Sequence, residues 1–130
     1  LFVGTPNADL LFTGDSIITN EYVDNTLVSV NGMIRASAKL YAGDYDLKNP
    51  LISPMYGDFA DFPPTYLVSG TRDLLLSDTV KVHRKLREAG VLADLNIFEG
   101  IPHGAYLGVP GSREYNGALG GLRKFLELHL

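Results

Sequence analysis

An acid and a histidine each follow a short apolar run, just past the point where we expect a strand to end. Asp73 comes after the run 66–68, and His103 comes thirty positions later, after the run 95–98. One helix-like segment separates the two runs. Because catalytic groups gather at the carboxyl ends of the strands in an open α/β sheet, we expect both side chains on loops at the same rim of one sheet.

An acid–histidine pair of this kind serves hydrolysis through a covalent acyl-enzyme. A serine attacks the carbonyl carbon, the histidine takes up its proton, and a buried acid orients the histidine and stabilises its charged form. Taken singly, Asp73 is better explained as a residue that caps a loop, and His103 as a loop histidine bonded to the main chain. The interval between them fits one helix and one strand, so together they favour the acid and the base of a triad.

Further motifs surround this pair along nearly the whole chain. In order they are Thr13-Gly14-Asp15-Ser16, Tyr41-Ala42-Gly43-Asp44, Pro50-Leu51-Ile52-Ser53-Pro54, Pro63-Pro64-Thr65, the run 70–78, the run 86–91 and Glu99-Gly100-Ile101-Pro102-His103-Gly104. This arrangement resembles the C-terminal part of the hormone-sensitive-lipase family of α/β-hydrolases, which comprises esterases and lipases. By this resemblance Asp73 matches the acid of the family's triad and His103 matches its base. Tyr106 and Leu107, in the loop after His103, would border the substrate pocket.

The resemblance also implies a fold and an activity. The fold class is α/β: a partial α/β-hydrolase fold with about three parallel strands and flanking helices, in which residues 1–130 are the C-terminal part of a single domain. The implied activity is hydrolysis of small carboxylic esters with short acyl chains, with no metal and no organic cofactor. A homodimer formed through the strand near 94–98 and the last helix is a further implication.

The nucleophile of such an enzyme is absent from this sequence. The family's elbow has the form Gly-x-Ser-x-Gly, because the strained turn needs small residues on both sides of the serine, and no such run occurs. The run most similar to this motif is Gly14-Asp15-Ser16, but the position that requires the second glycine holds Ile18, which is β-branched and stiff. Since the order in α/β-hydrolases is serine, acid, histidine, we expect the nucleophile and the oxyanion hole upstream of Leu1. By itself the chain should be inactive.

Two other readings stay open. The chain is alternatively a non-catalytic interaction domain that kept a hydrolase scaffold, or, less favoured, a hydrolase that uses Ser16 directly. Leu1-Phe2-Val3 has the character of the end of a buried strand. Three strands of this kind would expose an apolar parallel edge, and such edges aggregate. We therefore expect the chain to be stable only with a partner, either the upstream half of the same hydrolase or another copy.

Composition excludes several other classes of function. The chain is 45% hydrophobic and 20% charged with a net charge of −4, and it has no basic run, so nucleic acid is not an expected partner. It contains no cysteine, which excludes disulfides and thiolate metal sites. No apolar stretch is long enough to span a membrane and no signal peptide is visible, so the expected location is cytoplasmic.

The elements that must position Asp73 and His103 follow from apolar patterns and turn residues. We expect strands over 66–68 and 93–98, and helices over 30–41, 78–89 and from Ser112 onward. Ser29 and Ser77 are the expected N-caps of the first two helices. The apolar stripe of the middle helix is expected to comprise Leu76, Thr79, Val80, His83 and Leu86.

Overall fold

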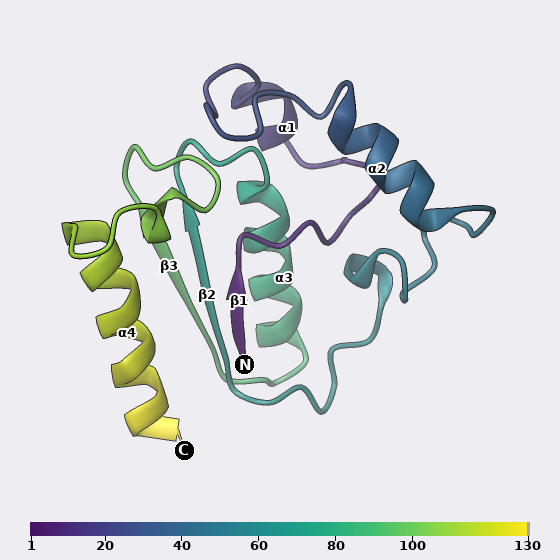
Figure 1. The fold of residues 1–130 in the computed structure, drawn as a ribbon. Helices are drawn as coiled ribbons and strands as arrows, with labels where there is room; N and C mark the ends of the chain where they lie inside the picture. Colours follow the sequence, from purple (N-terminus) through teal and green to yellow (C-terminus); the bar gives the residue numbers. More distant parts are fainter. Residues whose placement is uncertain (130) are drawn as a thin grey trace.

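Three parallel strands form the centre of the computed structural model, which describes residues 1–129 (Figure 1). Strand β1 (Phe2–Gly4) pairs with β2 (Thr65–Gly70), and β2 pairs with β3 (Ala93–Phe98), in the order β1-β2-β3. The two pairings share one register, in which Val3, Leu67 and Leu95 lie side by side. The predicted parallel sheet is confirmed, and all three carboxyl ends reach the same rim.

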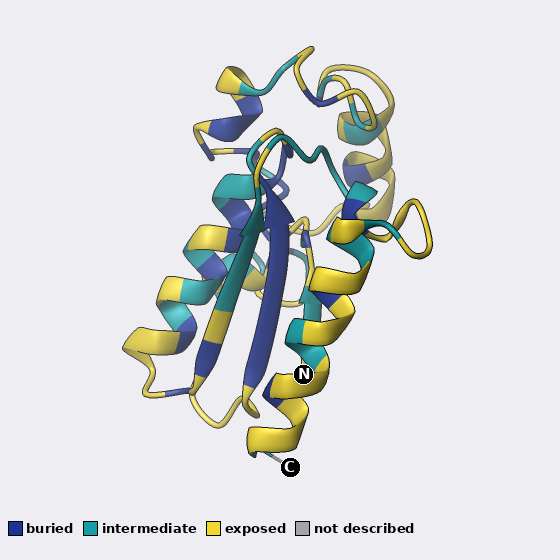
Figure 2. Cartoon of the chain, turned by 90° about the vertical axis from the view of Figure 1, so that its left-hand side faces the viewer, coloured by how far each residue is buried: buried dark blue, intermediate teal, exposed yellow. Residues whose placement is uncertain are grey.

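Two helices cover the sheet, one on each face (Figure 2). On one side α3 (Leu76–Glu88) packs against β2 and β3, and on the other α4 (Arg113–His129) does so. Every residue of β2 is buried, as expected for a central parallel strand covered on both faces. The chain is therefore a layered α/β structure, and the β2 side chains alternate between two hydrophobic clusters.

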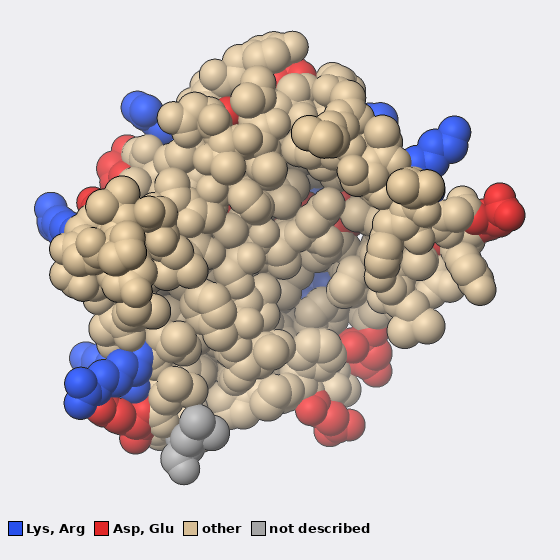
Figure 3. Space-filling view, in the orientation of Figure 1, with Lys and Arg blue, Asp and Glu red and all other residues tan. Residues whose placement is uncertain are grey.

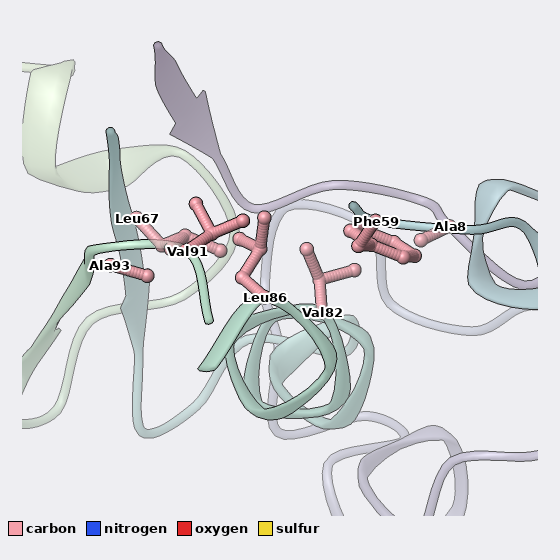
Figure 4. Close-up of a cluster of buried hydrophobic side chains, with 7 residues drawn as sticks. All are labelled: Ala8, Phe59, Leu67, Val82, Leu86, Val91 and Ala93. Carbon is pink, nitrogen blue, oxygen red and sulfur yellow. The ribbon is translucent and has the colours of Figure 1, made fainter. Parts of the chain in front are cut away.

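The cluster beneath α3 joins the sheet to that helix (Figure 4). It contains Ala8, Phe59, Leu67, Val82, Leu86, Val91 and Ala93. The cluster beneath α4 contains Tyr66, Val68, Tyr106, Ala118 and Phe125. In α4, a Cβ at Gly117 would press on the Phe98 ring, and one at Gly121 would collide with the Tyr66 hydroxyl. These glycines let α4 pack closely on the sheet, which offsets their low helix propensity.

A connecting segment, residues 10–43, lies over the carboxyl end of the sheet (Figure 1). It contains the short helix α1 (Ser16–Thr19) and the longer α2 (Met33–Ala42). Together with the loop after β2 it forms a third hydrophobic cluster, which includes Leu10, Phe12 and Leu74. Two single-turn 3₁₀ helices, Pro54–Tyr56 and Ala105–Leu107, complete the elements. The connecting segment thus stands beside the loops on which Asp73 and His103 were predicted.

Two predicted helix starts are wrong. Helix α2 begins at Met33 rather than at residue 30, because Gly32 has φ = 113°, a backbone conformation outside the helix, and Gly32 rather than Ser29 is the N-cap. Helix α3 begins at Leu76, so Ser77 lies inside its first turn and is not the cap. Its buried apolar face includes Val82, while Val80 is 36% exposed, which corrects the predicted stripe.

The end of the chain agrees better with expectation. Helix α4 starts at Arg113, and the Ser112 hydroxyl accepts a hydrogen bond from the Tyr115 N–H at 3.1 Å, as an N-cap does. No helix within residues 1–129 is long and apolar enough to cross a membrane. On the face shown in Figure 3, most of the charged side chains lie toward the periphery, and Lys and Arg side chains are interspersed with Asp and Glu. That face therefore shows no extended basic patch.

Candidate active site

Asp73 and His103 meet at the carboxyl end of the sheet. The Asp73 Oδ1 atom lies 3.1 Å from the His103 Nδ1 atom. The Asp73 side chain is fully buried, whereas 26% of the His103 side chain is exposed. The two side chains follow neighbouring parallel strands, β2 and β3, so the sheet positions an acid and a histidine, thirty residues apart, in direct contact.

Asp73 is held as a carboxylate. Its Oδ2 accepts a hydrogen bond from the Ser69 hydroxyl at 2.8 Å, and its Oδ1 accepts one from the Leu75 N–H at 2.8 Å. Burial by itself would raise the pKa of Asp73, but hydrogen bonds from His103, Thr5, Leu75 and Ser69 outweigh it and hold the pKa below its ordinary value. An ionised carboxylate only accepts hydrogen bonds, so the pair requires a proton on His103 Nδ1.

The loop that carries His103 is fixed against the end of β2. The Arg72 N–H donates to the Ile101 carbonyl at 3.1 Å, and the Gly100 N–H donates to the Thr71 hydroxyl at 2.8 Å. A Cβ at Gly70 would overlap the Ile101 carbonyl. Glycine is therefore required at position 70, because any side chain there would push the two loops apart.

The connecting segment braces the loop that carries Asp73. The Asn20 side-chain amide donates to the main-chain carbonyls of Thr71, at 3.2 Å, and of Asp73, at 2.8 Å. Asp24, fully buried, accepts a hydrogen bond from the Leu74 N–H at 2.8 Å. Sequence reasoning missed both supporting residues, because nothing in a turn-rich stretch shows which distant loop its side chains reach.

A third strand end contributes to the site. Thr5 directly follows β1, and its Oγ1 atom lies 2.6 Å from His103 Nδ1. It was not predicted, although a signal was available: the rule that selects Asp73 and His103 at the ends of β2 and β3 selects Thr5 at the end of β1. Within residues 1–129 the His103 ring bonds only to Thr5 and Asp73, in both cases through Nδ1. Its Nε2 atom is left for another group.

The two predicted substrate-binding residues lie in different environments. Tyr106 is buried against α4, its ring stacked on Phe98 with 6.2 Å between centroids. Burial, with a contribution from the negative charge of Asp73, raises the pKa of Tyr106 to about 12. Gly4 makes room for its hydroxyl, because a Cβ there would collide with it. Leu107 is 41% exposed. Tyr106 therefore supports the site from beneath, and Leu107 lies at the surface.

Ser16 has the contacts of a structural residue. It is buried, its hydroxyl donates to the Leu74 carbonyl at 2.8 Å, and it accepts a hydrogen bond from the Ser77 N–H at 2.9 Å. The Ser77 hydroxyl in turn accepts one from the Ser16 N–H at 3.0 Å. Ser16 thus ties α1 to the first turn of α3.

Within the described part of the chain, no group of three or more His, Asp or Glu side chains is placed to hold a metal ion.

Comparison with known proteins places this geometry in context. Residues 3–107 match a family described as having the alpha/beta hydrolase fold. The chain is 26% identical over 101 residues to an esterase of Acinetobacter venetianus, covering 78% of this chain and 33% of that protein. It is also 36% identical over 61 residues to the hormone-sensitive lipase of Mus musculus, covering 45% of this chain and 8% of the lipase.

Solved structures extend the likeness over the whole chain. The crystal structure of an esterase, E25, superposes with a TM-score of 0.97 at 52% identity, covering 100% of this chain and 40% of that one. An esterase from the bacterial hormone-sensitive lipase family superposes with a TM-score of 0.88 at 31% identity, covering 98% of this chain and 42% of that one. The chain thus spans well under half the length of these relatives.

Proposed function

Because this chain belongs to the α/β-hydrolase-fold family and, within it, to the hormone-sensitive lipases and their related esterases, we propose that it supplies the acid and the base of a serine carboxylesterase. The observation that carries the proposal is the contact between the buried carboxylate of Asp73 and Nδ1 of His103, with Nε2 of the same ring unengaged. The chain order of acid and then histidine agrees with that of α/β-hydrolases.

In the proposed mechanism His103 moves protons through Nε2. It takes the proton of the attacking serine as that serine adds to the ester carbonyl, and it returns the proton to the departing alcohol as the acyl-enzyme forms. It then takes a proton from a water molecule that attacks the acyl-enzyme, and the serine leaves with that proton. Asp73 stays ionised throughout and stabilises the imidazolium that appears at each stage.

The nucleophile would come from outside residues 1–130. The sequence contains no Gly-x-Ser-x-Gly run, and Ser16 is engaged with the main chain of Leu74. We propose that a segment preceding Leu1 in the complete protein carries the serine and the oxyanion hole. The outer edge of β1 suits pairing with such a segment, because β1 is an edge strand of the sheet and pairs with β2 on its other side.

The substrate and assembly are part of the same proposal. The proposed substrates are small esters with short acyl chains, and no cofactor takes part in the proposed mechanism. In this proposal Leu107, which is exposed, would border the substrate pocket of the complete protein, while Tyr106 is buried beneath it. A homodimer through β3 and α4, and a cytoplasmic location, remain predictions.

The test compares the complete protein with two histidine variants in the hydrolysis of p-nitrophenyl butyrate. We expect His103→Ala to lower kcat by on the order of 10⁶-fold, as loss of a triad base does in serine hydrolases. His83→Ala is the matched control, because His83 lies on α3 and its Nε2 contacts the Ala93 carbonyl at 3.2 Å; its rate should stay near that of the wild type. Equal rates for both variants would favour the non-catalytic interaction domain instead.

A further inference from the structure

Thr5 makes the shorter of the two contacts with the His103 ring. Its Oγ1 atom lies 2.6 Å from Nδ1, whereas Asp73 Oδ1 lies at 3.1 Å. Thr5 is 6% exposed. Its main chain is fixed by a hydrogen bond from its N–H to the Val68 carbonyl at 2.9 Å, and it has φ = 38°, in the left-handed region that residues other than glycine seldom adopt. The hydroxyl is therefore held in place by β2.

The hydrogens at this junction fit only one arrangement. Asp73 is ionised and can only accept, so Nδ1 must carry the proton that the two share. The Thr5 hydroxyl then accepts from the same Nδ1–H, and its own hydrogen is free to point elsewhere. Thr5 is among the groups that lower the pKa of Asp73, as expected when the hydroxyl hydrogen is directed toward the carboxylate.

We propose that Thr5 is a positioning residue of the acid–base pair, whose hydroxyl accepts from His103 Nδ1–H beside the Asp73 carboxylate and so fixes the orientation of the ring. This inference rests on the proposed function, since it assigns Thr5 a part in the work of His103. No bond to Thr5 forms or breaks in the reaction. The Nδ1–H and the hydroxyl hydrogen both stay where they are while Nε2 gains and loses its proton.

Without the hydroxyl, the ring would be held by Asp73 alone. A single contact of 3.1 Å to Oδ1 leaves the ring free to rotate about its own bonds. Oδ1 is also shared with the Leu75 N–H, which weakens its hold further. The ring would then turn part of the time away from the Asp73 carboxylate, and Nε2 would no longer be aimed at the serine.

The experiment uses the complete protein with three variants. Thr5→Val removes the hydroxyl and keeps the β-branched shape, Thr5→Ser restores a hydroxyl, and Thr65→Val is the control. Thr65 is fully buried and donates to the Pro63 carbonyl at 2.7 Å, at the opposite end of β2 from the site. Two readouts are taken: kcat and KM for p-nitrophenyl butyrate, and the proton resonance of the His103 Nδ1–H group.

We expect Thr5→Val to lower kcat by about 10- to 100-fold, the effect of losing one charge-assisted hydrogen bond, with KM within about twofold of the wild type. Its His103 Nδ1–H resonance should move upfield and broaden, because one of the two acceptors of that hydrogen is gone and the ring is no longer held. Thr5→Ser should return kcat to within about threefold of the wild type and restore the resonance, and Thr65→Val should change neither readout. Should Thr5→Val fail to fold, Thr5→Ala removes the same hydroxyl from a smaller side chain and replaces it in the comparison.

The inference is overturned if the variant without the hydroxyl keeps the wild-type Nδ1–H resonance, whatever its rate, or if serine fails to restore that resonance. Failure of the proposed function has a different signature. A wild-type protein that hydrolyses no ester would refute the esterase proposal, while the Nδ1–H resonances of the valine and serine variants would still decide whether Thr5 positions the ring.

Discussion

Replacement of Asp73 by asparagine removes the charge of the site and keeps its shape. The asparagine Oδ1 can still accept from the Leu75 N–H, and its amide can donate to the Ser69 hydroxyl in place of the bond that now runs the other way. The fold should therefore survive. What is lost is the negative charge that lies 3.1 Å from His103 Nδ1.

The size of the effect follows from that distance. Two unit charges 3.1 Å apart attract by about 5 kcal/mol at an effective dielectric constant of about 20. At about 1.4 kcal/mol for each factor of ten in rate, this corresponds to a loss of about four orders of magnitude in kcat. Because the imidazolium charge is spread over two nitrogens, we expect a loss of between about 10³- and 10⁴-fold.

The assay is the initial rate of p-nitrophenyl butyrate hydrolysis by the complete protein at saturating substrate. Asp44→Asn is the matched control, because it makes the same change of charge at an exposed carboxylate, and its kcat should equal that of the wild type. Far-ultraviolet circular dichroism of both variants establishes that the fold is intact. A folded Asp73→Asn protein that keeps more than a tenth of the wild-type kcat would refute the reasoning.

Four further predictions concern the scaffold. Gly70→Ala should abolish ester hydrolysis and lower the melting temperature, because its Cβ would overlap the Ile101 carbonyl. Gly120→Ala, in α4 with open space around it, should be tolerated and raise stability by up to about 1 kcal/mol. Similar melting curves for the two variants would contradict this assignment of the Gly70 contact. Burial raises the pKa of Asp78 to about 6 from 3.8, so the folded state binds that proton more tightly than the unfolded chain does. The free energy of unfolding should then fall by up to about 3 kcal/mol as the pH rises from about 4 to about 6, relative to Asp78→Asn; urea titrations with parallel pH profiles would show otherwise. Ser16→Ala should cost about 1–3 kcal/mol of stability through two unpaired main-chain groups and leave kcat unchanged, and a loss of rate without a loss of stability would revive Ser16 as the nucleophile. Residues 1–130 expressed alone should hydrolyse no ester above background and should aggregate; a cooperatively folding monomer in sedimentation and urea experiments would argue against an unpaired strand edge.

Local patterns were sufficient to predict the sheet and the central pair of the site. The run 93–98 is a strand with the predicted bounds, and β2 extends the predicted run 66–68 at both ends. Short apolar runs bounded by glycine, proline and aspartate carry this information within a few residues. Once the strands are known to be parallel, the shared rim brings Asp73 and His103 together, as observed.

Long-range contacts determine what local patterns could not predict. The first turn of α3 is capped from outside the helix, by the Asp73 carboxylate on the Leu75 N–H and by the Ser16 hydroxyl on the Ser77 N–H, 61 positions away. Ser77 itself therefore gave a misleading signal. Val80 and Val82 are equally apolar, and only the packing of α3 on the sheet buries the second rather than the first. Thr5 lies 98 positions from His103 and became part of the site only through the pairing of β1 with β2.

Labelling of the complete protein with a fluorophosphonate tests most directly whether Asp73 and His103 serve a serine nucleophile. The reagent reacts with activated serines, and mass spectrometry of the digested protein locates the adduct. We predict a single labelled serine in a segment that precedes Leu1, and loss of labelling in His103→Ala. A label on Ser16 or elsewhere within residues 1–130, or undiminished labelling of His103→Ala, would contradict the assignment of this chain as the acid and base half of an esterase.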